Sequence, residues 1–136
     1  MTLPTLTDPA SLVTRLKARA AELGFAFTGI APATDADGFA RFEQWLDRGF
    51  AGEMSYLHNL RAEHQHPRSI HETARSVMML ALEYTSAATP ATHESAGRVA
   101  RYAQGRDYHR DIWDRLNTLA AWLEAEAPGC RTERCV

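Results

Sequence analysis

The chain has 136 residues, 45% of them hydrophobic and 24% charged, a balance typical of one folded domain with a buried core. Its formal net charge of −2 excludes the overall basic character of many nucleic-acid-binding proteins. Residues 1–8 lack the basic start and apolar core of a secretory signal, and no apolar run reaches membrane-spanning length. With only two cysteines, these features predict a cytoplasmic protein in a reducing compartment, away from membranes.

The spacing of cysteines and histidines matches no standard metal site. Cys130 and Cys135 do not form a C-x-x-C pair, and no further Cys/His pair completes a zinc site. Four histidines lie close together with no cysteine near them: His58, His64, His66 and His71. We therefore expect a polar surface loop here rather than a metal centre.

The first half of the chain predicts three helices and a strand. Asp8-Pro9 combines a capping side chain with proline at the first helical position, and Gly24 is a natural helix stop. The segment 25–31 (FAFTGIA) predicts a strand. Spaced aromatic residues predict a second helix over 39–46, and Gly52 opens a short third helix that extends to Leu60.

The second half predicts three more strands and a long helix. Residues 61–74 are expected to be irregular, whereas the continuous apolar run 76–84 (SVMMLALEY) predicts a strand buried on both faces. A surface loop over 85–97 is followed by a third strand at 98–103. Asp107 then caps a helix that runs to about Ala127, and the segment 130–136 is expected to begin a fourth strand.

This order of elements predicts an α/β fold, specifically an α+β sandwich. We expect a small mixed sheet of about four strands flanked by helices and incomplete at the C-terminus, with residues 1–136 forming a single domain.

The junction between the third strand and the long helix concentrates groups that bind anions or move protons. Gly105 permits a sharp turn, and Arg106 can grip a phosphate or carboxylate. Asp107 can act as a helix cap, and Tyr108 and His109 occupy the first helical turn, where the helix dipole favours a neutral imidazole. The phenol and imidazole could form a proton relay or a ligand-orienting pair. Alternatively, Tyr108 packs its ring while His109 faces water.

Sequence motifs narrow the possible functions further. The chain has no G-x-G-x-x-G, P-loop, G-x-S-x-G or H-E-x-x-H pattern, so a dinucleotide dehydrogenase, a nucleotide hydrolase or a serine hydrolase is unsupported. The runs RYAQGRDYH (101–109), GEMSYL (52–57) and RSVMMLALEY (75–84) resemble the N-terminal region of epoxyqueuosine reductases. The similarity extends from about Leu12 to the C-terminus.

The resemblance implies a cobalamin-dependent, iron–sulfur oxidoreductase that converts epoxyqueuosine to queuosine in the anticodon region of tRNA. It implies cofactor-binding roles for four residues of the motif: Tyr102, Gly105, Arg106 and Asp107. It also implies that Tyr108 and His109 are the catalytic residues, those closest to the chemistry.

The chain departs from that family in two respects. It has no C-x-x-C-x-x-C run to hold iron–sulfur clusters, and the family's acidic proton donor is missing after the segment that ends in Cys135-Val136. We therefore expect a fragment that is inactive alone and that works with a missing C-terminal half or a separate iron–sulfur partner.

Two alternatives remain at this stage. One is a non-enzymatic module that binds tRNA or another anion through a set of arginines: Arg98, Arg101, Arg106, Arg110 and Arg115. The other is a flavin-binding, reductase-like domain, although no sequence feature singles out flavin.

Overall fold

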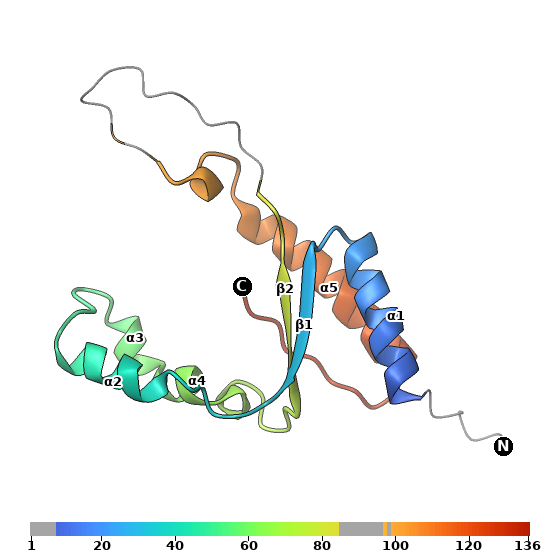
Figure 1. The fold of residues 1–136 in the computed structure, drawn as a ribbon, viewed down its shortest axis with the longest axis horizontal. Coiled ribbons are helices and arrows are strands. Elements are labelled where there is room, and N and C mark those ends of the chain that lie inside the picture. The colour runs from blue at the N-terminus through green and yellow to red at the C-terminus, as the bar shows by residue number, and fades with distance from the viewer. Residues whose placement is uncertain (1–7, 85–96, 98) are drawn as a thin grey trace. The chain divides into compact units, whose positions relative to one another are not determined.

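The computed structural model describes residues 8–84, 97 and 99–136. The chain divides into two compact units, one built from residues 1–28 and 80–136 and the other from residues 29–79, and each is described by itself. Figure 1 shows the helices and strands with the labels used below. In the described part of the chain, no helix is both long enough and apolar enough to cross a membrane.

Helices α1 (Pro9–Glu22) and α5 (Tyr108–Glu126) form the core of the first unit. Both helices begin as predicted, because the carboxylate of the capping aspartate accepts a hydrogen bond from a backbone N–H of the first turn. The distance is 3.0 Å from Ser11 N to Asp8 Oδ2 and 3.0 Å from His109 N to Asp107 Oδ1. The buried residues of this helix pair are small or aliphatic: Leu16, Ala20, Leu119 and Ala120.

Gly24 ends α1, as predicted, and it also makes room for a contact with α5. Its φ is +87°, a conformation that favours glycine. Arg115 Nη1 on α5 donates a hydrogen bond of 2.7 Å to the carbonyl of Leu23, at the end of α1. A Cβ atom at position 24 would lie 2.4 Å from that nitrogen. One guanidinium therefore caps α1 from a helix far away in the sequence.

Among the described residues the sheet has two antiparallel strands, β1 (Phe27–Pro32) and β2 (Ser76–Ala81). The flanking backbone bonds run from Ala26 N to Ala81 O at 2.8 Å and from Ala33 N to Arg75 O at 2.9 Å. Helices and a sheet together confirm the α/β class.

The expectation of about four strands is wrong for the described residues. Instead of a strand at 98–103, residues 101–103 form a short 3-10 helix, η2 (Arg101–Ala103), while Arg98 lies outside the described part. The segment 130–136 has no regular structure. A strand needs a neighbouring strand to satisfy its backbone, and here a local bond is made instead, from Ala103 N to Ala100 O at 2.9 Å.

The prediction that β2 is buried on both faces is also wrong. Met79 is 67% exposed, and Val77, Met78 and Leu80 are only half-buried. In a sheet of two strands, each strand has one unpaired edge and few neighbours to cover its faces. The predicted surface loop at 85–97 lies outside the described residues, apart from Gly97.

The second unit is more helical than predicted. It contains α2 (Phe39–Asp47), α3 (Tyr56–Asn59), α4 (Arg61–Gln65) and the 3-10 helix η1 (Pro67–Ser69). Leu46 is 2% exposed and Ala51 is equally buried, so both belong to its small core. The third helix is shorter than expected, and the segment predicted to be irregular contains α4 and η1.

Candidate functional site

The predicted site residues lie in one continuous corner between η2 and the start of α5. The turn is tied by a hydrogen bond of 2.8 Å from Gln104 Nε2 to the carbonyl of Val99. Gly105 makes this turn without a positive φ, so the special backbone freedom considered from the sequence is not used. All ten residues from 101 to 110 are exposed. The corner is therefore an open surface of its unit rather than part of the unit's core.

Four aromatic side chains follow one another along this corner, and we call them the aromatic row: Tyr84, Tyr102, Tyr108 and His109. The centroids of Tyr84 and Tyr102 are 6.4 Å apart and those of Tyr102 and Tyr108 are 6.1 Å apart, both in edge-to-face geometry. The rings of Tyr108 and His109 stack at 4.3 Å with planes 20° apart. The three tyrosines keep 64%, 53% and 39% of their surface exposed, in chain order.

Asp107 connects the helix start to the imidazole at the end of the aromatic row. Its Oδ1 lies 3.0 Å from the backbone nitrogen of His109 and 2.7 Å from His109 Nδ1. The backbone N–H, followed by the imidazole, lowers the pKa of the Asp107 carboxyl below its ordinary value of 3.8, against a smaller opposing effect of desolvation. At neutral pH Asp107 is therefore a carboxylate that can only accept hydrogen bonds.

Two arginines near this corner, Arg106 and Arg115, make contacts within the chain. The side chain of Arg106 is 85% exposed, but its Nη2 lies 2.9 Å from Asp111 Oδ2. Arg115 is used as the cap of α1 described above. The structure therefore joins Tyr102, Asp107, Tyr108 and His109, whereas the guanidinium of Arg106 is directed to a carboxylate of α5.

A comparison of the sequence with known protein families gives a match that includes the residues of this corner. The sequence model described as "Epoxyqueuosine reductase QueG, DUF1730" matches residues 64–136, which is more than half of the chain. The chain belongs to the epoxyqueuosine reductase family. The aromatic row and Asp107 lie entirely within the matched residues.

Curated proteins called epoxyqueuosine reductase match almost the whole chain. The protein of Gloeobacter violaceus is 42% identical over 128 residues, which cover 90% of this chain and 38% of the relative. The protein of Synechococcus sp. (strain RCC307) is 36% identical over 138 residues, covering 97% and 41%. That of Pseudomonas aeruginosa is 36% identical over 124 residues, covering 88% and 34%. The chain thus spans about a third to two fifths of the length of these relatives, and no solved structure matches.

Tyr84 was not among the residues assigned to this family's site from the sequence, although the structure adds it to the aromatic row. It closes the apolar run 76–84, and that position at the end of a strand was the only sequence signal for it. Its neighbour Tyr102 follows only after a long segment, so spacing could not reveal the contact.

The histidine-rich segment of the second unit is explained by local contacts. His66 Nδ1 accepts the backbone N–H of Arg68 at 2.9 Å, and the ring of His64 lies 4.8 Å from that of Phe42. His71 Nε2 is 3.3 Å from the hydroxyl of Thr73. Among the described residues there is no group of three or more His, Cys, Asp or Glu side chains that could hold a metal ion.

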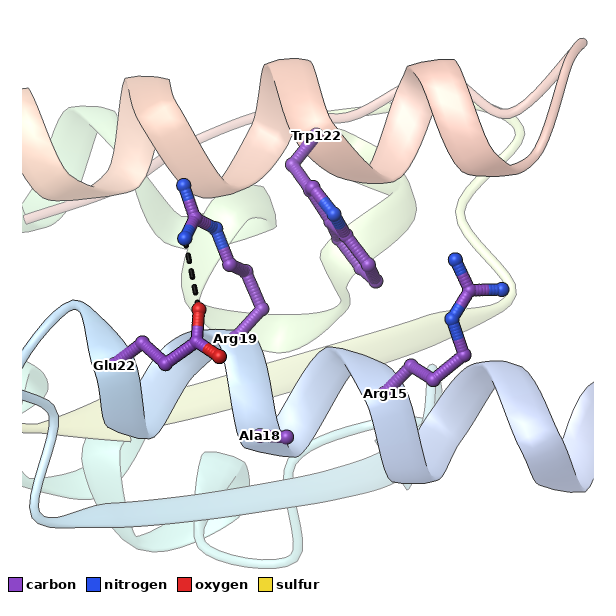
Figure 2. Close-up of a pocket in the computed structure, with 5 residues that line it drawn as sticks. All are labelled: Arg15, Ala18, Arg19, Glu22 and Trp122. Carbon is purple, nitrogen blue, oxygen red and sulfur yellow. Dashed lines mark hydrogen bonds and ion pairs between the residues drawn. The ribbon is translucent and has the colours of Figure 1, made fainter.

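A cavity of about 410 Å³ lies elsewhere in the first unit, between α1 and α5. Figure 2 shows the indole of Trp122 between two arginines of α1. Arg15 lies over the indole at 5.6 Å and pairs with Glu126, while Arg19 Nη1 lies 2.8 Å from Glu22. Both guanidiniums are therefore paired with carboxylates of the chain. The Arg15 contacts join α1 to α5, whereas the Arg19–Glu22 pair lies within α1.

Proposed function

We propose that this chain is the cobalamin-binding part of a cytoplasmic epoxyqueuosine reductase that acts on tRNA, and that its aromatic row forms one wall of the cobalamin and substrate site. The single observation that carries this proposal is the exposure of four contiguous aromatic rings, inside the residues that match the family. Exposed rings of this kind mark a surface that a ligand or partner covers.

The side chains of the corner fit a corrin in their chemistry. A corrin is a broad, largely flat macrocycle with amide groups at its rim, so it needs apolar faces to pack against and polar groups around its edge. Tyr84 and Tyr102 offer ring surface, and Tyr108 and His109 add a hydroxyl and an imidazole. Bound cobalamin would supply the electrons that reduce the substrate.

The chain's own residues would bind and orient the cofactor and substrate, and they would not themselves supply electrons. Tyr84 and Tyr102 would cover one side of the cofactor and exclude water from it. Tyr108 and His109 would present an O–H and a ring nitrogen to the ligand, and Asp107 would hold the imidazole in place.

Electron delivery needs groups that these 136 residues do not supply. Iron–sulfur clusters are usually held by sets of four cysteines, and the sequence contains only Cys130 and Cys135, both free and exposed. We propose that the cluster ligands come from polypeptide outside these residues, either in the same protein or in a partner. The 136 residues alone would then bind cobalamin without turning over substrate.

The contacts favour this proposal over the two alternatives. An anion-binding module needs available cationic groups, and two of the five arginines named for it, Arg106 and Arg115, are already engaged by Asp111 and by the carbonyl of Leu23. No contact in the described part of the chain points specifically to flavin.

The proposal is tested by titrating the protein with cob(II)alamin under anaerobic conditions and following visible absorbance. Tyr102 is 53% exposed, which leaves about 100 Å² of its ring surface for a ligand to cover. Covering half to all of this area contributes about 1.3–2.5 kcal/mol, so Tyr102→Ala should raise the Kd about 8- to 70-fold. Tyr56→Ala is the matched control, because Tyr56 is 54% exposed and lies in the other unit.

Circular dichroism must show that both variants remain folded. The proposal fails if folded wild-type protein does not bind at high micromolar cob(II)alamin. It also fails if Tyr102→Ala binds as well as wild type, or if Tyr56→Ala weakens binding to the same extent.

A further inference from the structure

We infer that Asp107 is a positioning residue that holds His109 in the tautomer with its proton on Nδ1, so that Nε2 is presented to the ligand as a hydrogen-bond acceptor. The identity of the ligand rests on the proposed function. The tautomer and the orientation of the ring rest on the geometry alone.

The protonation of Nδ1 follows from its partner. His109 Nδ1 lies 2.7 Å from Asp107 Oδ1, a short distance typical of a charge-assisted hydrogen bond. A carboxylate has no proton to donate. Nδ1 must therefore carry the proton, and in the neutral imidazole Nε2 is left with its lone pair.

Two further contacts fix the orientation of the ring. The same Oδ1 accepts the backbone N–H of His109 at 3.0 Å, which anchors the carboxylate to the first turn of α5. The ring of Tyr108 stacks on the imidazole at 4.3 Å. The side chain of His109 is nevertheless 54% exposed, and its Nε2 has no hydrogen-bond partner among the described residues.

The tautomer of His109 determines which chemical groups of a ligand can bond to this corner. An imidazole with a bare Nε2 accepts a hydrogen bond from a hydroxyl or an amide N–H, whereas the opposite tautomer would present a donor and would leave such a group unsatisfied. The amide groups at the rim of cobalamin carry N–H donors of this kind. Asp107 therefore acts on the ligand through His109, in addition to capping α5.

Nitrogen-15 NMR of the imidazole tests the tautomer directly, without any cofactor. Nδ1 donates to the Asp107 carboxylate, so wild-type protein at about pH 8.5, where an imidazole is neutral, should show the Nδ1-protonated tautomer of His109 as the major form. Asp107→Ser is the informative variant, because serine caps a helix about as well as aspartate but carries no charge. It should keep α5 folded and shift the proton population toward Nε2. Asp114→Ser is the control, because Asp114 is exposed on α5 and its carboxylate makes no contact with His109 or Arg106.

A second measurement links the tautomer to ligand binding. Loss of one oriented hydrogen bond should weaken cob(II)alamin binding by about 3- to 10-fold in Asp107→Ser and leave binding by Asp114→Ser unchanged. The inference is overturned if wild-type His109 carries its proton on Nε2, if Asp107→Ser leaves the tautomer unchanged, or if that variant binds cob(II)alamin like wild type. Absence of binding by wild-type protein would instead overturn the proposed function, and the tautomer result would still stand.

Discussion

Replacing Leu119 by alanine tests whether the contact between α1 and α5 forms the core of the first unit. Leu119 is 4% exposed and lies in the core that the two helices share. The substitution removes three carbons, worth about 0.8 kcal/mol each, and leaves part of a cavity, so we expect a loss of about 2.5–4 kcal/mol. A loss of this size is a large part of the 5–15 kcal/mol that typically stabilises a domain.

Urea unfolding followed by circular dichroism measures this loss, and hydrogen exchange of the α5 amides assigns it to the first unit. The unfolding midpoint should fall by about 1–2 M. Val13→Ala is the control, because Val13 is 38% exposed on α1 and alanine has the higher helix propensity, so its effect should stay within about 0.5 kcal/mol. A loss below about 1 kcal/mol for Leu119→Ala, or an equal loss for Val13→Ala, would refute this account of the core.

Two further predictions follow from shifted pKa values. Asp107→Ala should destabilise the protein at neutral pH, and the deficit should shrink as the pH falls below 3.8, because the pKa of Asp107 is lowered in the folded state and protonation removes the charge that strengthens its bonds with His109. Urea midpoints at about pH 7 and about pH 2 test this, and a constant deficit would contradict it. Although the residue as a whole is exposed, partial desolvation of its thiol, and to a lesser degree the carboxylate of Glu124, raises the pKa of Cys130 above 9.0. Iodoacetamide at about pH 8 should therefore modify Cys130 more slowly in native than in urea-unfolded protein, as peptide mass spectrometry would report. Equal rates would contradict this prediction.

The helix ends were predictable because their causes are local. Asp8 and Asp107 accept backbone N–H groups only two or three residues away, and Gly24 takes the positive φ that stops α1. The spacing of residues is sufficient to recognise such signals. The cap that Arg115 places on α1 could not be predicted, because it joins residues 92 positions apart.

The strands were less predictable because a strand depends on a partner. The segments 98–103 and 130–136 contain residues that favour strands, but a sequence pattern does not say whether a neighbouring edge exists to pair with. In the structure, residues 101–103 turn into η2, and Thr132 is held by the Glu124 carboxylate at the end of α5.

The site was predictable to the extent that its residues are neighbours in the chain. Tyr108 and His109 are adjacent, and Asp107 contacts the imidazole from two residues away. The sequence suggested Asp107 as a cap or a cofactor contact. Only the side-chain geometry shows that Asp107 Oδ1 bonds both the backbone nitrogen and the Nδ1 of His109. The contact of Tyr84 with Tyr102 could not be predicted, because it joins two residues that are far apart in the sequence.

The division of the chain inside its two strands has a practical consequence. The boundaries fall between Thr28 and Gly29 in β1 and between Met79 and Leu80 in β2. Residues 29–79 therefore leave and rejoin the remainder of the polypeptide through a single antiparallel pair, which is the topology of an inserted module. We therefore expect that a tight hairpin turn could replace residues 29–79 while the chain order of the segments that carry the aromatic row stays the same.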